Sequence, residues 1–239
     1  MSERSERALF LSEFVRDPVR TASVMPSSSA LAARMVAALP EHGNPVVVEL
    51  GPGTGAFTAA IRERLGGRGR QLAVEVNERM SVRLRGRFPG VEVVTAGADD
   101  LPGLLAERGI PAADLIVSGL PWTVYFGGAR PLADTLASVL APTGALTQFT
   151  YAWSSWTPQA RRQRAHLRAA FEEVVLSRTV WRNAPPAFVY VARRPRTPRT
   201  LPVPAYTTWA RPSCTHRRAL STPQAAPCSP RTLWNARRR

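Results

Sequence analysis

Residues 46–55 read Val-Val-Val-Glu-Leu-Gly-Pro-Gly-Thr-Gly, a short apolar run that passes directly into a glycine-rich turn. The run 46–50 is typical of a buried strand, and we expect a helix over residues 56–65, directly after the turn. Glycines in such a turn permit tight backbone angles and a close approach of a ligand, because no Cβ stands in the way. The stretch therefore predicts a ligand-binding turn at the carboxyl end of a strand.

Strand-like and helix-like segments alternate on both sides of this turn. The expected strands are short apolar runs at residues 46–50, 71–76, 91–95, 114–118, 144–151, 173–181 and 187–193. The expected helices lie between them at residues 29–39, 56–65, 78–87, 101–108, 131–140 and 158–170. Such alternation predicts an α/β fold, with a seven-stranded, mostly parallel sheet covered by helices on both faces. The last two strands resemble an antiparallel hairpin added at the edge.

Two carboxylates accompany the turn. Glu49 precedes the first glycine by two residues, and Glu75 follows Gly55 by twenty residues, in the next expected strand. A carboxylate at that place can accept hydrogen bonds from both ribose hydroxyls of an adenosine. A nicotinamide dinucleotide site is the competing interpretation, but Gly51, Gly53 and Gly55 run Gly-x-Gly-x-Gly rather than Gly-x-Gly-x-x-Gly.

The turn resembles motif I of the class I S-adenosylmethionine-dependent methyltransferases, and the resemblance extends across most of residues 20–193. Further segments look like the bacterial phospholipid N-methyltransferases, whose cofactor core is similar to that of the rRNA adenine dimethyltransferases. Together with the turn, the segments that carry this resemblance are Pro26-Ser27-Ser28, Ser118-Gly119-Leu120-Pro121-Trp122, Gln148-Phe149-Thr150-Tyr151 and Asn183-Ala184-Pro185-Pro186-Ala187.

The resemblance implies an enzyme with a Rossmann-like fold that uses S-adenosylmethionine to methylate the amino head group of phosphatidylethanolamine stepwise. The residues it implies in cofactor binding are Glu49, Gly51, Gly53, Gly55, Glu75, Asp99 and Ser118. We expect no metal site and no covalent nucleophile, because a sulfonium is already an activated electrophile.

Aromatic residues concentrate after the fourth and fifth expected strands. They are Trp122, Tyr125, Phe126, Tyr151, Trp153 and Trp156. Aromatic rings attract a methylated ammonium through cation–π contact, and a tyrosine hydroxyl can bind the head group. We expect Trp122 and Tyr151 to be the catalytic-site residues that hold the substrate, while some of the other rings serve core or lid packing.

The sequence departs from the related families at two places. Adenine dimethyltransferases have asparagine in the turn after strand four, where it helps hold the target amine, but this chain has Gly119. That departure argues against nucleic-acid methylation. After strand three the families place Gly-Asp-Ala, whereas residues 96–100 read Ala-Gly-Ala-Asp-Asp, so Asp99 is displaced from the usual adenine-binding position.

The positive charge is distributed unevenly. The chain of 239 residues has a formal net charge of +15, and nine of its arginines lie in residues 195–239, which contain no acidic residue. We expect that segment to be a disordered tail and residues 25–194 to form the methyltransferase domain. Residues 1–24 form an amphipathic segment with Phe10 and Phe14 on its apolar face, suited either to a membrane surface or to a lid.

Neither a membrane-spanning apolar run nor a signal-peptide core is evident, and both cysteines lie in the tail. We therefore expect a cytoplasmic protein, peripheral to the inner face of the membrane, with an anionic membrane surface and a phospholipid as partners. Two other functions remain open. One is methylation of a small metabolite or of rRNA adenine by the same fold, and the other is non-catalytic binding of membrane or nucleic acid.

Overall fold

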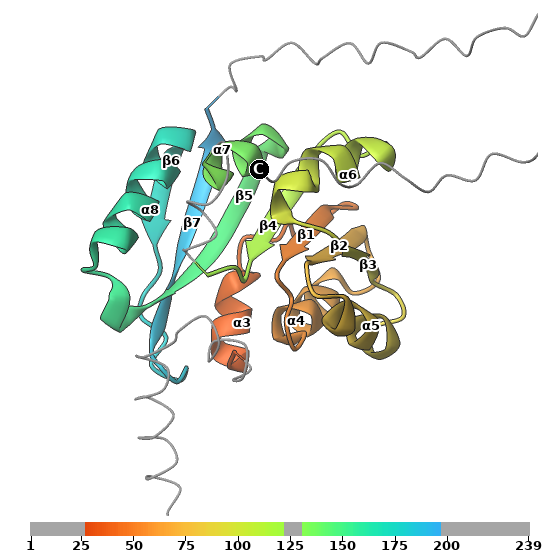
Figure 1. The fold of residues 1–239 in the computed structure, drawn as a ribbon, viewed down its shortest axis with the longest axis horizontal. Helices are drawn as coiled ribbons and strands as arrows, with labels where there is room; N and C mark the ends of the chain where they lie inside the picture. Colours follow the sequence, from red (N-terminus) through yellow and green to blue (C-terminus); the bar gives the residue numbers. More distant parts are fainter. Residues whose placement is uncertain (1–26, 122–130, 197–239) are drawn as a thin grey trace, which may run out of the picture. The chain divides into compact units, whose positions relative to one another are not determined.

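The computed structural model describes residues 27–121 and 131–196. They form one seven-stranded sheet in the order β3-β2-β1-β4-β5-β7-β6, with helices on both faces (Figure 1). The strands are β1 Val46–Leu50, β2 Arg70–Glu75, β3 Glu92–Thr95, β4 Ala113–Ser118, β5 Leu140–Tyr151, β6 Phe171–Leu176 and β7 Ala187–Pro195. The α/β expectation is confirmed, as is the number of strands.

The order in which the chain adds strands to the sheet reverses at β1. This strand pairs in parallel with β2 on one side and with β4 on the other. The chain therefore builds β2 and β3 outward from one side of β1, then returns to add β4 and β5 on the other. The carboxyl ends of β1 and β4 meet at such a reversal, which is where open α/β sheets bind ligands.

The expected hairpin lies at one edge of the sheet. β7 is antiparallel to both β5 and β6 and runs between them, so β6 is the outermost strand. The first strand of the hairpin ends at Leu176 rather than at residue 181. The reason is Ser177, whose hydroxyl accepts the Val189 N–H at 3.0 Å in place of a backbone carbonyl.

Some of the helices begin at a residue whose side chain caps their first turn. The helices are α3 Ser29–Met35, α4 Ala56–Leu65, α5 Glu78–Arg87, α6 Leu101–Glu107, α7 Leu132–Ser138 and α8 Pro158–Ala170, with short 3-10 turns η1 Ala98–Asp100 and η3 Ala152–Ser154. Asn77 caps α5 by accepting two backbone N–H groups, and Thr157 caps α8. α3 is shorter than expected, because the chain tightens after Met35 into turns such as Leu39 N–H to Val36 carbonyl.

The helices bury the two faces of the sheet separately. On one face, α3 and α4 pack over β1, β4 and β7 through residues such as Leu31 and Ile61. On the other face, α6, α7 and α8 pack through residues such as Leu105, Leu136 and Leu167. Both faces are thus closed, and the loops at the strand ends remain available for a site.

One buried side chain joins segments that are far apart in the sequence. Asn183, in the connection between β6 and β7, accepts the Ser28 N–H at 3.0 Å and donates to the Pro185 carbonyl at 2.8 Å. Ser28 is in turn the N-cap of α3, where its hydroxyl accepts the Leu31 N–H. Asn183 therefore fixes where α3 begins, and with it the position of Ser27.

We predict that Asn183→Ala lowers the free energy of unfolding by about 2 kcal/mol, because it leaves a half-buried N–H and a buried carbonyl without their partner. Asn77→Ala is the matched control, since Asn77 also makes two backbone hydrogen bonds but is exposed, and it should cost about 1 kcal/mol. Urea unfolding measures both values. Equal losses in the two variants would contradict the role assigned to Asn183.

Candidate functional site

A pocket lies at the carboxyl ends of β1, β4 and β5, beside the glycine-rich turn. The residues that line it come from the turn, the start of α4, the end of β5, and positions before α3 and after β4. They are Ser27, Gly51, Pro52, Gly53, Thr54, Ala56, Phe57, Gly119, Phe149 and Tyr151. The predicted ligand-binding turn therefore borders a real pocket, and it does so at the switch point of the sheet.

The three glycines of the turn all have positive φ, and two of them, Gly53 and Gly55, have different structural roles. Gly53 has a φ of +53°, and a Cβ built on it would meet no atom within 4 Å. Gly55 has a φ of +86°, and its Cβ would lie 2.5 Å from the ring of Phe88, which follows the last residue of α5. Gly53 thus opens the main chain toward the pocket, whereas Gly55 permits the close contact between the start of α4 and the end of α5.

Glu75 lies at the end of β2, next to this turn. It is nearly buried, and its two carboxylate oxygens accept the Gly53 N–H at 3.3 Å and the Asn77 N–H at 3.0 Å. The carboxylate therefore reaches the turn from the neighbouring strand. Its anchoring by two backbone groups fixes it in one orientation beside Gly53.

Glu49 points away from the pocket, into the contact between β1, β2 and α4. It is fully buried, and Gln71 donates to it at 3.5 Å while also donating to the Thr58 carbonyl at 3.3 Å. Burial raises the pKa of the Glu49 carboxyl from 4.5 to about 8, despite hydrogen bonds from Thr58 and Gln71 that lower it. At neutral pH the protonated form is therefore favoured, and Glu49 acts as a neutral hydrogen-bonding group behind the turn.

The backbone of β4 comes unusually close to the turn at Gly119. Its N–H donates to the Leu50 carbonyl at 2.8 Å, and a Cβ at this position would lie 2.7 Å from the Gly51 carbonyl oxygen. An asparagine here would have to displace the turn. The close contact between this position and the turn therefore requires glycine, the residue that distinguishes this chain from the adenine dimethyltransferases.

Three aromatic rings form one wall of the pocket. Phe149 packs edge-to-face against Phe57 at 5.8 Å and against Tyr151 at 5.4 Å, measured between ring centroids. Tyr151 is half-buried, and burial raises the pKa of its phenol, so the hydroxyl stays protonated at neutral pH. The wall therefore offers apolar ring surface and one hydroxyl that can donate or accept a hydrogen bond.

The other predicted residues lie at different distances from this pocket. Ser118 is buried at the end of β4, where its hydroxyl accepts the Leu120 N–H. Asp99 is exposed on η1, beyond β3, and it does not line the pocket. Trp122 lies outside the described residues, and so do Tyr125 and Phe126.

Two differences from the sequence expectations concern the aromatic and small residues. Trp156 was a candidate for the substrate-binding rings, but 72% of its surface is exposed and it does not line the pocket. Phe57 and Phe149 line it instead, although apolar residues in an expected helix and strand indicate only core. Ser27 was detectable as part of Pro26-Ser27-Ser28, but its place opposite the turn depends on the contact with Asn183.

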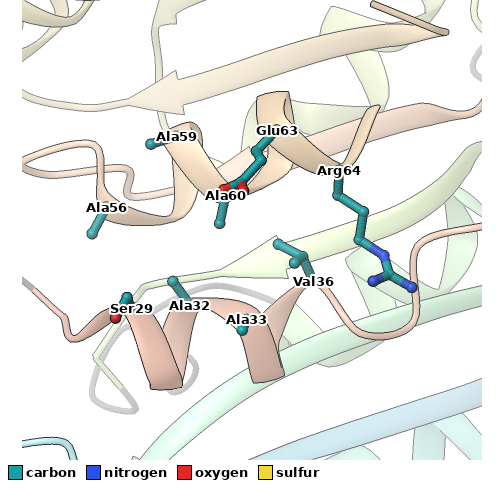
Figure 2. Close-up of a pocket in the computed structure, with 9 residues that line it drawn as sticks. All are labelled: Ser29, Ala32, Ala33, Val36, Ala56, Ala59, Ala60, Glu63 and Arg64. Atoms are coloured by element: carbon teal, nitrogen blue, oxygen red, sulfur yellow. The ribbon is translucent and has the colours of Figure 1, made fainter. Parts of the chain in front are cut away.

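A second pocket of about 400 Å³ lies between α3 and α4 (Figure 2). It is lined by Ser29, Ala32, Ala33 and Val36 on one side and by Ala56, Ala59, Ala60, Glu63 and Arg64 on the other. Figure 2 shows small side chains facing one another across it, with Arg64 toward one end and Glu63 beside Ala60. This pocket shares Ala56 with the first one, but its walls are mostly methyl groups.

Within residues 27–121 and 131–196, no cluster of histidine, cysteine and carboxylate side chains could hold a metal ion. None of the helices in these ranges combines the length and apolar character needed to span a membrane.

Comparison with known proteins identifies the class. The chain is 35% identical over 189 residues to ornithine lipid N-methyltransferase from Singulisphaera acidiphila, covering 77% of this chain and 94% of that protein. The chain belongs to the class I S-adenosylmethionine-dependent methyltransferases. Within this class it resembles the bacterial lipid N-methyltransferases. No family model matches the chain.

Of two further similarities, one covers less of the chain and the other is low in sequence identity. Ribosomal RNA small subunit methyltransferase A from Acidobacterium capsulatum is 37% identical over 97 residues, which are 40% of this chain and 33% of that protein. Human methyltransferase-like protein 13, solved in complex with SAH, superposes with a TM-score of 0.50 at 16% identity, covering 74% of this chain and 83% of that one. The structural match confirms the fold of the methyltransferase.

We predict that the buried carboxyl of Glu49 makes stability depend on pH. Because its pKa is raised in the folded state, the stabilisation is fully present below pH 4.5 and is lost as the pH rises to about 8. Glu49→Gln keeps a neutral side chain, so the free energy of unfolding of the native protein should fall relative to that of the variant between pH 5 and 8. Urea unfolding at four pH values measures this, and parallel pH profiles would refute it.

Proposed function

We propose that this methyltransferase transfers methyl groups to the amine of a membrane lipid head group. The observation that carries the proposal is the match to ornithine lipid N-methyltransferase, which extends over 94% of that protein and so includes more than the cofactor core. The pocket supports it, since an aromatic wall and a tyrosine hydroxyl suit an amine that becomes a methylated ammonium.

The residues around the turn fit S-adenosylmethionine. Gly53 leaves open space where any other residue would place a Cβ, so the ligand can approach the main chain closely. Glu75 presents an anchored carboxylate beside it, suited to the ribose hydroxyls. We therefore assign cofactor binding to Gly51, Gly53 and Glu75, with Ser118 and Glu49 supporting the strand ends from behind.

The cofactor supplies an activated methyl group on a sulfonium, so this chain's own residues need only position the amine and exclude water. Phe57, Phe149 and Tyr151 build an apolar wall that disfavours a protonated amine, because burial lowers the pKa of an amine. The protonated Tyr151 hydroxyl can bind the head group. Its raised pKa makes Tyr151 an orienting group at neutral pH, not a base.

Two classes of lipid present a primary amine on the head group as the methyl acceptor. The similarity favours an ornithine lipid, and phosphatidylethanolamine with its methylated derivatives is the phospholipid alternative. Both place the reaction at a membrane, and we propose that the enzyme works there from the cytoplasmic face. RNA adenine is a weaker candidate, because the rRNA methyltransferase match covers 33% of that protein and Gly119 admits no asparagine.

We predict that Gly53→Ala weakens S-adenosylmethionine binding about tenfold or more, because the added methyl group occupies the space next to the turn. Gly66→Ala is the matched control: Gly66 ends α4 with a similar φ of +57°, and its Cβ would also meet nothing within 4 Å. Both variants should lose about 1 kcal/mol of stability from backbone strain. Isothermal titration calorimetry separates them, and equal cofactor affinities would contradict the assignment.

The function itself is tested with methyl-labelled S-adenosylmethionine and four acceptors offered separately. The acceptors are vesicles with ornithine lipid, vesicles with phosphatidylethanolamine, total RNA, and a mixture of small soluble amines. We expect label in a lipid fraction, and the head group that gains it identifies the substrate. Label in RNA or in a soluble amine alone would overturn the proposal, as would no transfer to any acceptor.

A further inference from the structure

Two tryptophans of the described chain project almost fully into solvent. Trp156 is 72% exposed and Trp181 is 77% exposed. Trp156 lies in the connection between β5 and α8, and Trp181 lies in the connection between β6 and β7. Exposed tryptophans cost free energy in water, and a pair of them marks a surface that something covers.

The two connections lie side by side at the edge of the sheet that carries the pocket. The Ala152 N–H donates to the Pro186 carbonyl at 2.8 Å, and Tyr151 is paired with Ala187 in the β5–β7 ladder. Val180, next to Trp181, forms an isolated bridge with the same Ala187. Figure 1 shows the end of β5 and the start of β7 on the same side of the sheet, where the first connection begins and the second one ends.

Aliphatic and basic side chains extend this surface. Val175 and Leu176, at the end of β6, are also exposed, and as successive residues of this outermost strand they lie on its opposite faces. Exposed arginines flank them in the β6–β7 connection and at the start of α8: Arg178 and Arg182, then Arg161 and Arg162. The acidic residues between positions 151 and 196 are Glu172 and Glu173, which lie at the start of β6, whereas the tryptophan connections follow its other end.

This combination fits the interface of an anionic membrane. Tryptophan rings settle at the level of lipid head groups, where one part of the ring is apolar and the N–H is hydrated. Each arginine near an anionic surface adds about 1 kcal/mol of attraction. Aromatic rings and arginines also bind nucleic acids, but the exposed Val175 and Leu176 favour an apolar partner.

We infer that the surface formed by Trp156, Trp181, Val175 and Leu176 with its flanking arginines docks the enzyme on an anionic lipid bilayer, with the pocket facing the head groups. The inference rests on the proposed function, since it names the surface through which a lipid amine reaches Tyr151. The sequence predicts a membrane contact in residues 1–24, which lie outside the described residues, whereas this surface has a known place relative to the pocket.

The test measures binding of the full chain to vesicles by sedimentation. The vesicles are made of phosphatidylcholine with or without phosphatidylglycerol, and contain no amine that can be methylated. The double variant Trp156→Ser and Trp181→Ser should lose about tenfold in partitioning to the anionic vesicles. Val82→Ser is the control, because Val82 is an exposed apolar residue on α5 and its loss should change nothing.

A second pair of variants tests the charge. Arg178→Gln with Arg182→Gln should weaken binding to anionic vesicles severalfold, while the weaker binding to pure phosphatidylcholine stays the same. Arg79→Gln, another exposed arginine on α5, is the control. Cofactor titration and thermal unfolding of every variant show whether the fold and the turn are intact.

The outcomes separate this inference from the proposed function. Unchanged vesicle binding by the folded tryptophan variant overturns the docking surface, even if the protein methylates lipid. A loss of RNA binding with unchanged vesicle binding also overturns it, and assigns the surface to nucleic acid. Lost vesicle binding by a folded, cofactor-binding variant supports it, even if labelled methyl groups appear in no lipid.

Discussion

The close approach of β4 to the turn after β1 is the contact on which the rest of the site depends. The Gly119 N–H donates to the Leu50 carbonyl at 2.8 Å, one residue beyond the last paired residue of β4. This contact brings the Gly51 carbonyl so near that Gly119 has no room for a Cβ. The turn, the end of β4 and the aromatic wall on β5 thereby meet around one pocket, at the point where the sheet reverses its order.

Two carboxylates from neighbouring strands support this point in different ways. Glu75 lies beside the turn, where its carboxylate accepts the N–H groups of Gly53 and Asn77. Glu49 is buried between β1, β2 and α4, where burial raises its pKa to about 8 and favours the neutral form. The two side chains carry the same functional group, and their surroundings hold one against the turn and bury the other behind it.

The wall of the pocket and the exposed tryptophans lie at the same end of the sheet. Tyr151 ends β5 within the pocket wall, and the chain continues from it through η3 to the exposed Trp156. The antiparallel return of β7 brings the connection that contains Trp181 to the same end. If β7 were parallel to β5, it would begin at the opposite end of the sheet, and the connection that contains Trp181 would lie there.

Apolar periodicity and glycine spacing were enough to predict the α/β fold, the bounds of α4, α5 and α8, and a ligand-binding turn with Glu75 beside it. These features depend on residues close in sequence, on capping side chains and on the rule that parallel strands end at one edge. Tertiary packing alone determined that Glu49 is buried behind the turn, that Phe57 and Phe149 line the pocket, and that Trp156 is exposed. It also determined how Asn183 positions Ser27, because each of these outcomes depends on contacts between segments whose distance no local pattern encodes.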